Sequence, residues 1–180
     1  EAANEQMSAE GLRVLAFAAR VLDGREDEVT ADPMAFVDDL VFVGMVGIID
    51  PLRAEAVDAV RTAHAAGIDV RMITGDHTGT ASAIGAQLGL GPGAISGTEL
   101  AAMSDEELAE ALPRLHVFGR VTPSDKLRLA DVMQRQGAVV AMTGDAVNDA
   151  AALKKADIGV AMGSGSEVTK QAGKLILTDD

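Results

Sequence analysis

Two apolar runs, separated by an acidic and turn-rich stretch, open the chain. The runs cover residues 12–22 and 40–49, and residues 23–39 connect them. Apolar runs of this length between turn-forming residues predict a pair of antiparallel strands with a long connection. The second run ends at Asp50 and Pro51, because proline fixes its own φ and disfavours helix at the residue before it. A hinge or domain junction is therefore expected at this point.

Beyond this junction, short apolar segments alternate with amphipathic ones. Buried strands separated by amphipathic helices are typical of a parallel sheet covered on both faces. The predicted fold class is α/β, a doubly wound parallel sheet preceded by the short antiparallel strand pair. Ligands in such sheets bind at the carboxyl ends of the strands. Helices are expected at residues 53–66, 78–88, 104–112, 124–136, 146–155 and 167–172, and strands at residues 68–74, 116–120, 138–143, 158–162 and 174–177.

Composition narrows the possible functions. The 180 residues suffice for one domain, or for one domain and part of a neighbour, and they contain no cysteine, which excludes thiol chemistry here. A net charge of -13 repels nucleic acid, and no Trp or Tyr is present to stack on bases. The acidity suits a hard cation such as Mg²⁺, although many acidic proteins are simply soluble. The longest apolar stretch, residues 40–49, is far shorter than the ~20 residues of a membrane-spanning helix, so this chain is expected to be soluble.

The tripeptide Thr-Gly-Asp occurs twice, at residues 74–76 and 143–145, each time between an apolar strand and a helix. One copy alone is equally well explained by an aspartate near a helix N-cap. Two copies in one small sheet favour a function. Asp76 and Asp145 are therefore expected at the ligand-binding edge of the sheet.

The second copy is followed by further oxygen-bearing side chains. Asn148 and Asp149 lie three and four positions after Asp145, a spacing that places side chains on one face of a helix. Two carboxylates and an amide near one point favour a bound cation, and oxygen ligands favour Mg²⁺. The alternative is two capping aspartates and a solvated asparagine. We interpret Asp145 as a metal ligand. Asn148 and Asp149 would either bind the metal directly or hold its ligands in place.

A lysine stands in the first turn of the helix predicted to follow Thr122 and Pro123. A cation at this end of a helix opposes the macrodipole, so the position of Lys126 fits a nearby anion. Taken alone, such a lysine more simply extends into solvent. Beside Thr74 and Asp145 it is interpreted as neutralising phosphate charge, which together with a metal provides the electrostatic half of phosphoryl transfer. No nucleophile can be assigned.

The ordered motifs resemble those of P-type ATPases, which belong to the haloacid-dehalogenase-like superfamily. The resemblance rests on residues 72–81 (MITGDHTGTA), 119–126 (GRVTPSDK) and 142–180 (MTGDAVNDAAALKKADIGVAMGSGSEVTKQAGKLILTDD), and residues 154–180 look most like the calcium- and sodium-pump branch. Residues 11–15 (GLRVL) and 47–53 (GIIDPLR) resemble the end of the nucleotide-binding domain and its hinge. The resemblance implies a Rossmann-like phosphorylation domain at residues 50–180 and the C-terminal part of a nucleotide-binding domain at residues 1–49.

The same resemblance implies roles for individual residues. Thr74 and Gly75 would hold the transferred phosphoryl group, and Asp76 would lie near the nucleotide. Lys126 would neutralise phosphate charge and Asp145 would bind Mg²⁺, supported by Asn148 and Asp149. Arg13 would contact the ATP phosphates, while Asp50 and Arg53 would belong to the hinge. The residues implied in nucleotide binding are Arg13, Asp50, Arg53 and Arg120.

The chain departs from the family pattern in three places. Ala146 stands where the family usually has glycine after the metal-binding aspartate, and Ala151 stands where it usually has proline. A methyl group at 146 could crowd the ligand, and losing the proline loosens the helix start, so reduced turnover is expected. The phosphorylation sequence Asp-Lys-Thr-Gly-Thr does not occur in these residues. The sheet is therefore expected to lack its first, central strand, a gap that rearrangement or self-association could close.

The resemblance implies a cytoplasmic piece of a membrane pump that couples ATP hydrolysis, through an aspartyl-phosphate, to cation transport. Its cofactors would be Mg²⁺ and ATP, and its partners the remaining domains and membrane helices of the pump. The piece alone is expected to be inactive, because it lacks the phosphorylated aspartate. Two alternatives are a non-catalytic module that binds Mg²⁺ and phosphate, and a soluble phosphatase of the same superfamily.

Overall fold

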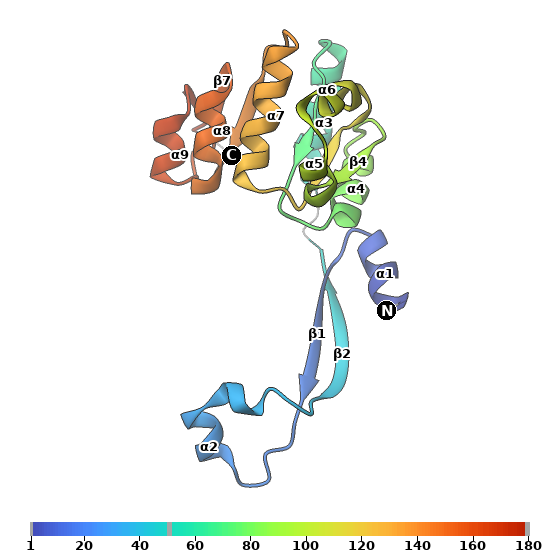
Figure 1. Ribbon diagram of the computed structural model, residues 1–180, viewed down its shortest axis with the longest axis vertical. Coiled ribbons are helices and arrows are strands. Elements are labelled where there is room, and N and C mark those ends of the chain that lie inside the picture. Colours follow the sequence, from blue (N-terminus) through green and yellow to red (C-terminus); the bar gives the residue numbers. More distant parts are fainter. Residues whose placement is uncertain (1, 50–51, 179–180) are drawn as a thin grey trace. The chain divides into compact units, whose positions relative to one another are not determined.

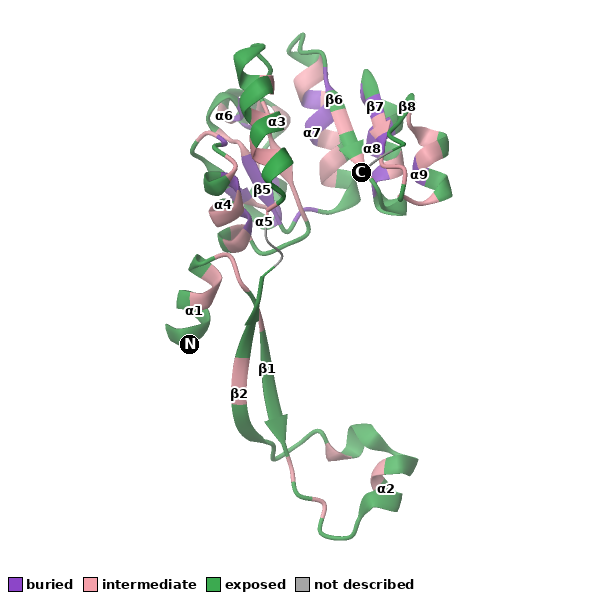
Figure 2. Cartoon of the chain, turned by 180° about the vertical axis from the view of Figure 1, so that it is seen from behind, coloured by how far each residue is buried: buried purple, intermediate pink, exposed green. Residues whose placement is uncertain are grey.

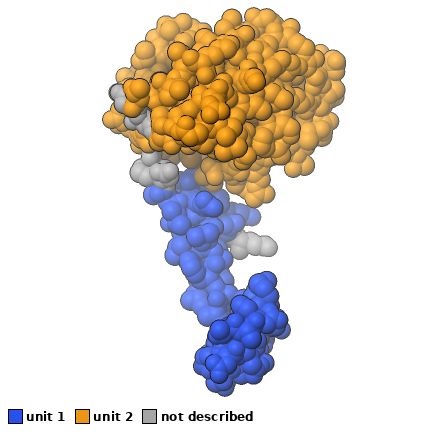
Figure 3. All heavy atoms as spheres, turned by 90° about the vertical axis from the view of Figure 1, so that its left-hand side faces the viewer, with its two compact units in different colours: residues 1–51 blue, residues 52–180 orange. Residues whose placement is uncertain are grey.

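The computed structural model describes residues 2–49 and 52–178. The chain divides after residue 51 into two compact units, here called unit 1 and unit 2 (Figure 3). The predicted hinge residues Asp50 and Pro51 lie outside the described residues. Among the helices described, none is both long enough and apolar enough to cross a membrane.

Unit 1 is built around the predicted strand pair. Strands β1 (Arg13–Ala19) and β2 (Val41–Ile48) run antiparallel, which confirms the prediction (Figure 1). Two segments predicted only as termini or connection are helical: α1 (Ala2–Ala9) and α2 (Glu26–Ala31), the latter followed by the 3-10 turn η1 (Pro33–Phe36). Acidic residues occupy the first turn of α2, where their negative charges interact favourably with the positive end of the helix dipole.

The described residues of unit 1, 2–49, form no core of their own. None of its described residues is buried (Figure 2), and Phe17 and Phe42 are 50% and 62% exposed. A two-stranded ribbon buries too little apolar surface to be stable by itself in water. The stability of the chain therefore resides in unit 2.

Unit 2 is an α/β structure with parallel strands, as predicted. The strands form two separate three-stranded parallel sheets, with the orders β3-β5-β4 and β6-β7-β8, and helices connect them (Figure 1). The elements of unit 2 are α3 (Ala54–Ala65), β3 (Met72–Ile73), α4 (Thr78–Gln87), β4 (Ala94–Ser96), α5 (Gly97–Ala102), α6 (Asp105–Ala111), η2 (Leu112–Arg114), β5 (Val117–Gly119), α7 (Pro123–Arg135), β6 (Ala141–Gly144), η3 (Val147–Asp149), α8 (Ala150–Lys155), β7 (Ile158–Ala161), α9 (Glu167–Ala172) and β8 (Leu175–Ile176).

Helix α7 packs against both sheets. Its Leu129 belongs to the main core cluster with Phe118 of β5, while its Ala130 packs with Val140 beside β6. Leu129, Ala130 and Phe118 are fully buried. One helix thus holds the two sheets together.

The start of α7 follows from its sequence. Thr122 caps the helix by accepting a hydrogen bond from the backbone N–H of Asp125, whose carboxylate accepts from the N–H of Thr122 at 2.7 Å. Pro123 occupies the first turn, where its missing N–H is not needed. This cap fixes the first residue of α7 and therefore the position of Lys126 in its first turn.

Candidate functional site

Hydrogen bonds join the loop after β3 to the loop after β5. The backbone N–H of Arg120 donates to the carbonyl of Asp76 at 2.8 Å, and that of Val121 donates to the carbonyl of Thr74 at 3.3 Å. The first Thr-Gly-Asp segment and the approach to α7 therefore lie side by side at the carboxyl ends of two parallel strands. This is the edge where ligands bind in such sheets.

The first Thr-Gly-Asp segment forms a tight turn. The Thr74 hydroxyl accepts from the backbone N–H of Asp76 at 3.1 Å and donates to the Asp76 carboxylate at 3.0 Å. Gly75 and Asp76 are exposed. Among the described residues, no lysine, arginine or histidine forms an ion pair with Asp76. The turn presents a glycine backbone and an unneutralised carboxylate to solvent.

The second Thr-Gly-Asp segment is more closely packed. Asp149 is only 6% exposed and lies against Gly144 at the end of β6. A Cβ at position 144 would come within 2.5 Å of the Cβ of Asp149 and 2.9 Å of Leu153, which is why glycine is required there. Asp145 is exposed, and its carbonyl accepts a hydrogen bond from the N–H of Ser166 at 2.8 Å.

Lys126 connects the start of α7 to this second segment. Its Nζ lies 2.5 Å from Oδ1 of Asp149, and the other carboxylate oxygen accepts from the backbone N–H of Ala146 at 3.2 Å. Lys126 therefore points inward to a partner and does not extend into solvent, with 20% of its side chain exposed. Three loops, those after β3, β5 and β6, are joined in this way.

The acidic groups at this edge do not form a closed metal cage. No group of three or more His, Asp or Glu side chains able to hold a metal occurs in the part of the chain that the structure describes. Asp149 is already paired with Lys126, whereas Asp145 and Asn148 are exposed. Magnesium commonly keeps several waters and binds through one or two carboxylates together with substrate phosphates. This donor set fits Mg²⁺ held mainly by Asp145.

The backbone at Ala146 explains how alanine is accommodated. Its φ of -91° and ψ of 155° are extended values that any residue adopts. Glycine is therefore not required by the backbone conformation at this position.

The predicted nucleotide-binding residues are divided between the two units. Arg13 begins β1 in unit 1, while Arg53 is the exposed N-cap residue of α3 in unit 2. Arg120 is exposed with a φ of 50°, a left-handed conformation that the sequence did not reveal. Asp50 lies outside the described residues.

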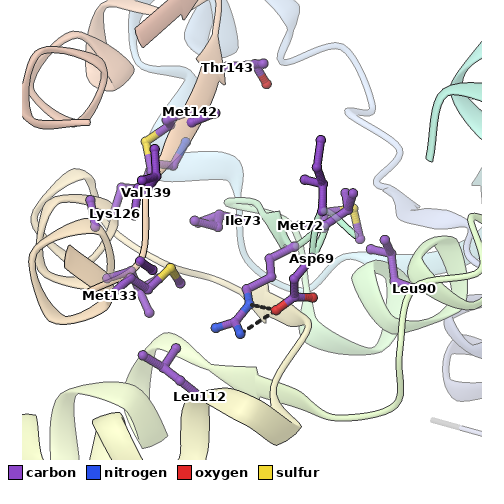
Figure 4. A pocket seen from close by; sticks show the side chains of 18 of the residues that line it. Asp69, Met72, Ile73, Leu90, Leu112, Lys126, Met133, Val139, Met142 and Thr143 are labelled. Carbon is purple, nitrogen blue, oxygen red and sulfur yellow. Dashed lines mark hydrogen bonds and ion pairs between the residues drawn. The ribbon is translucent and has the colours of Figure 1, made fainter. Parts of the chain in front are cut away.

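Sequence reasoning also missed a polar cluster beside β3. Nε and Nη2 of Arg71 donate to the Asp69 carboxylate at 3.0 and 2.6 Å, and Nε2 of His116 lies 3.6 Å from the other carboxylate oxygen. Arg71 and Asp69 also line a cavity between the two sheets (Figure 4). Only the unusual placement of an arginine within an apolar strand pattern could have indicated this cluster.

Comparison of the sequence with protein families identifies a family that agrees with the parallel α/β fold. Residues 5–157 match the family described as haloacid dehalogenase-like hydrolase, and the chain belongs to this family. Within it, the chain is similar to cation-transporting ATPases. It is 48% identical over 98% of its length to "Cation-transporting ATPase pma1" of Synechocystis sp., and 45% identical over its whole length to "Calcium-transporting ATPase 1" of Lactococcus lactis.

A third relative, "Probable cation-transporting ATPase F" of Mycobacterium bovis, is 47% identical over 99% of the chain. The chain spans 20% of the length of each of these three relatives. The predicted resemblance to cation-transporting ATPases of the haloacid-dehalogenase-like superfamily is therefore confirmed.

Proposed function

We propose that the chain is part of a P-type ATPase that couples ATP hydrolysis, through an aspartyl-phosphate, to cation transport. Within it, residues 52–178 bind Mg²⁺ and the transferred phosphoryl group at the edge formed by the loops after β3, β5 and β6. Unit 1 is assigned to the nucleotide-binding domain and unit 2 to the phosphorylation domain, on the cytoplasmic side of the membrane. The calcium- and cation-transporting names of the relatives support this assignment.

One observation carries the proposal: separate loops are tied together at one edge by the Arg120 to Asp76 hydrogen bond and the Lys126 to Asp149 ion pair. Asp76 and Asp145 are exposed carboxylates at the ends of the two sheets. A phosphate alone would be repelled by these charges, whereas a phosphate accompanied by a divalent cation would not.

Each residue then has a separate task. Gly75 offers a backbone N–H to the phosphoryl oxygens, and the Thr74 hydroxyl, which donates to Asp76 in this structure, would turn to donate to them. Lys126 supplies positive charge, and Asp149 fixes its position. The metal, held by Asp145 with Asn148 nearby, would neutralise charge that develops on the phosphoryl oxygens. Arg13, Arg53 and Arg120 are proposed to contact the nucleotide.

Isothermal titration calorimetry with MgCl₂, with and without inorganic phosphate, tests the metal assignment. We expect Asp145→Ala to weaken Mg²⁺ binding at least about tenfold, since it removes the principal charged ligand. Asp58→Ala removes an exposed carboxylate on α3 and serves as the matched control, with unchanged affinity. Equal Mg²⁺ affinity in the Asp145→Ala variant and the unmodified chain would remove Asp145 from the site.

The 180 residues by themselves are proposed not to turn over ATP, because they contain no Asp-Lys-Thr-Gly-Thr sequence. Incubation with labelled ATP and Mg²⁺ should leave the protein unlabelled. An acid-stable phosphoprotein would contradict this proposal and would favour the alternative of a soluble phosphatase with a different nucleophile.

A further inference from the structure

The loop between β7 and α9 lies directly against the backbone of Asp145. The N–H of Ser166 donates to the carbonyl of Asp145 at 2.8 Å. A Cβ at Gly165 would come within 2.9 Å of the same carbonyl oxygen and 3.1 Å of the Asp145 Cα, so a side chain here would force the two segments apart. The loop therefore holds the main chain of Asp145 from one side, while its carboxylate remains exposed.

Thr169 of α9 holds the next peptide group. Its hydroxyl donates to the carbonyl of Ala146 at 2.7 Å, across 23 positions of the sequence. The same carbonyl accepts from the N–H of Asp149 at 2.9 Å, so both of its lone pairs are used. The N–H of Ala146 donates to the Asp149 carboxylate at 3.2 Å. Each backbone group from the Asp145 carbonyl to the Ala146 carbonyl thus has a partner.

The hydroxyls of Ser166 and Thr169 form a directed chain of hydrogen bonds. Thr169 has one hydroxyl hydrogen and gives it to Ala146, so the Ser166 hydroxyl, 2.6 Å away, is the donor to Thr169. The Ser166 oxygen in turn accepts from the N–H of Thr169 at 3.2 Å. Hydrogen bonds in such a chain strengthen one another. The start of α9 is thereby coupled to the backbone of Ala146.

Capping of α9 accounts for Ser166 but not for Thr169. Ser166 is the N-cap residue, and accepting a backbone N–H is the ordinary task of a serine there. Thr169 lies inside the helix and is fully buried, where valine would have the same shape without a hydroxyl to satisfy. A threonine inside a helix usually bonds a carbonyl of its own preceding turn, whereas this one bonds another segment.

The Ala146 peptide also holds the ion pair described above. Asp149 is bonded to Ala146 twice, once through its backbone N–H and once through its carboxylate. The other carboxylate oxygen of Asp149 binds Nζ of Lys126 at 2.5 Å. Fixing Ala146 therefore steadies both charges assigned to this edge, the carboxylate of Asp145 and the ammonium group of Lys126.

We propose that Thr169 is a positioning residue for the metal ligand Asp145. This inference rests on the proposed function, because it takes Asp145 as the ligand of Mg²⁺. The Thr169 hydroxyl does not touch the metal; it fixes the Ala146 carbonyl and with it the turn that carries Asp145. A ligand whose main chain is already held loses less conformational freedom on binding, and residues that hold metal ligands commonly affect metal affinity.

Two substitutions at one position separate positioning from packing. Thr169→Val keeps the shape and loses the hydroxyl, whereas Thr169→Ser keeps the hydroxyl and loses the methyl group. We expect Thr169→Val to weaken Mg²⁺ binding about fivefold and Thr169→Ser to stay within about twofold of the unmodified chain. Backbone amide shifts in an NMR titration with MgCl₂ measure these affinities. A role in packing alone predicts the reverse order.

Amide hydrogen exchange without Mg²⁺ gives a second readout, independent of metal binding. In Thr169→Val, exchange should become faster at the amides of Ala146 and Asp149, because the carbonyl that organises this turn has lost one of its two donors. Exchange at Arg120, which belongs to the other sheet, should not change. Faster exchange confined to α9 would show that the hydroxyl only stabilises its own helix, and would overturn the inference.

Asp145→Ala in the same titration distinguishes this inference from the proposed function. If Asp145→Ala weakens Mg²⁺ binding and Thr169→Val does not, the inference is wrong and the metal assignment stands. If neither variant weakens binding, the metal assignment is wrong, and the inference falls with it. Equal weakening in Thr169→Val and Thr169→Ser would also overturn the inference, because the hydroxyl would then make no difference.

Discussion

Nζ of Lys126 lies 2.5 Å from Oδ1 of Asp149, and this ion pair ties the start of α7 to η3. The side chains are 20% and 9% exposed, so both charges are largely removed from water. Lys126→Met leaves the Asp149 carboxylate buried without its cation and should lower the free energy of unfolding by about 2 kcal/mol. Urea denaturation measures this change.

The matched control is Lys155→Met, which breaks an ion pair with Asp131 whose side chains are 38% and 39% exposed. An exposed pair contributes little, so a change within about 0.5 kcal/mol is expected. Equal losses of unfolding free energy in the two variants would show that burial does not increase the contribution of the Lys126 to Asp149 pair to stability.

The two Thr-Gly-Asp segments should respond differently to the same substitution. At Gly144 a new methyl would overlap Asp149 and Leu153, whereas at Gly75 it would meet no atom within 4 Å. Gly144→Ala should therefore cost about 2 kcal/mol of stability by overpacking. Gly75→Ala should change stability by less than about 0.5 kcal/mol. Thermal or urea unfolding of the pair of variants compares them directly, and similar losses would contradict the packing described for β6.

Acid should weaken the anchoring of α6 to α7. Hydrogen bonds from Arg135 and then Arg128 lower the pKa of Asp105 below its ordinary value of 3.8. A carboxyl whose pKa is lower in the folded state stabilises the fold above pH 3.8, and this contribution is lost as the pH falls through the folded-state pKa. Asp105→Asn should therefore be less stable than the unmodified chain at pH 7, with the difference shrinking below pH 3.8.

Urea unfolding across this pH range checks the prediction. Asp58→Asn, which removes an exposed partner of Arg61, is the control and should change stability little at any pH. A difference between Asp105→Asn and the unmodified chain that stayed constant down to acid pH would exclude the role assigned to Asp105.

Arg120 adopts a left-handed conformation with a φ of 50°. Glycine adopts this region without a steric cost, so Arg120→Gly should raise stability by up to about 1 kcal/mol. Arg120→Ala also removes the guanidinium group but keeps the Cβ, and with it the steric cost of the left-handed backbone, so it should not be more stable. If both variants behaved alike in urea unfolding, the side chain and not the backbone would account for the effect.

Local sequence signals predicted the helices well. Helix α9 occupies residues 167–172 as predicted. Helices α6 and α7 begin within one residue of their predicted starts, after capping boxes at Ser104 and Thr122. Such signals act over a few residues, so they can be read directly from the chain. Strand β4 and helix α5 were missed, because β4 has only three residues and follows a turn rich in glycine and proline.

Relationships between distant residues could not be predicted in the same way. Lys126 and Asp149 are 23 positions apart, and only their burial in the folded chain brings them together. The separation of the strands into two sheets likewise depends on which strands become neighbours, which periodicity does not determine. The motifs were sufficient to predict the edge of the sheet where the candidate site lies, whereas the ion pair within it could be found only in the structure.

The packing of α7 against both sheets has a consequence for unfolding. Leu129 and Ala130 are adjacent in this helix, yet each packs in a different core cluster. Unwinding this turn of α7 would therefore remove contacts from both sheets at once. The two sheets should consequently lose their structure in one cooperative transition and not one after the other.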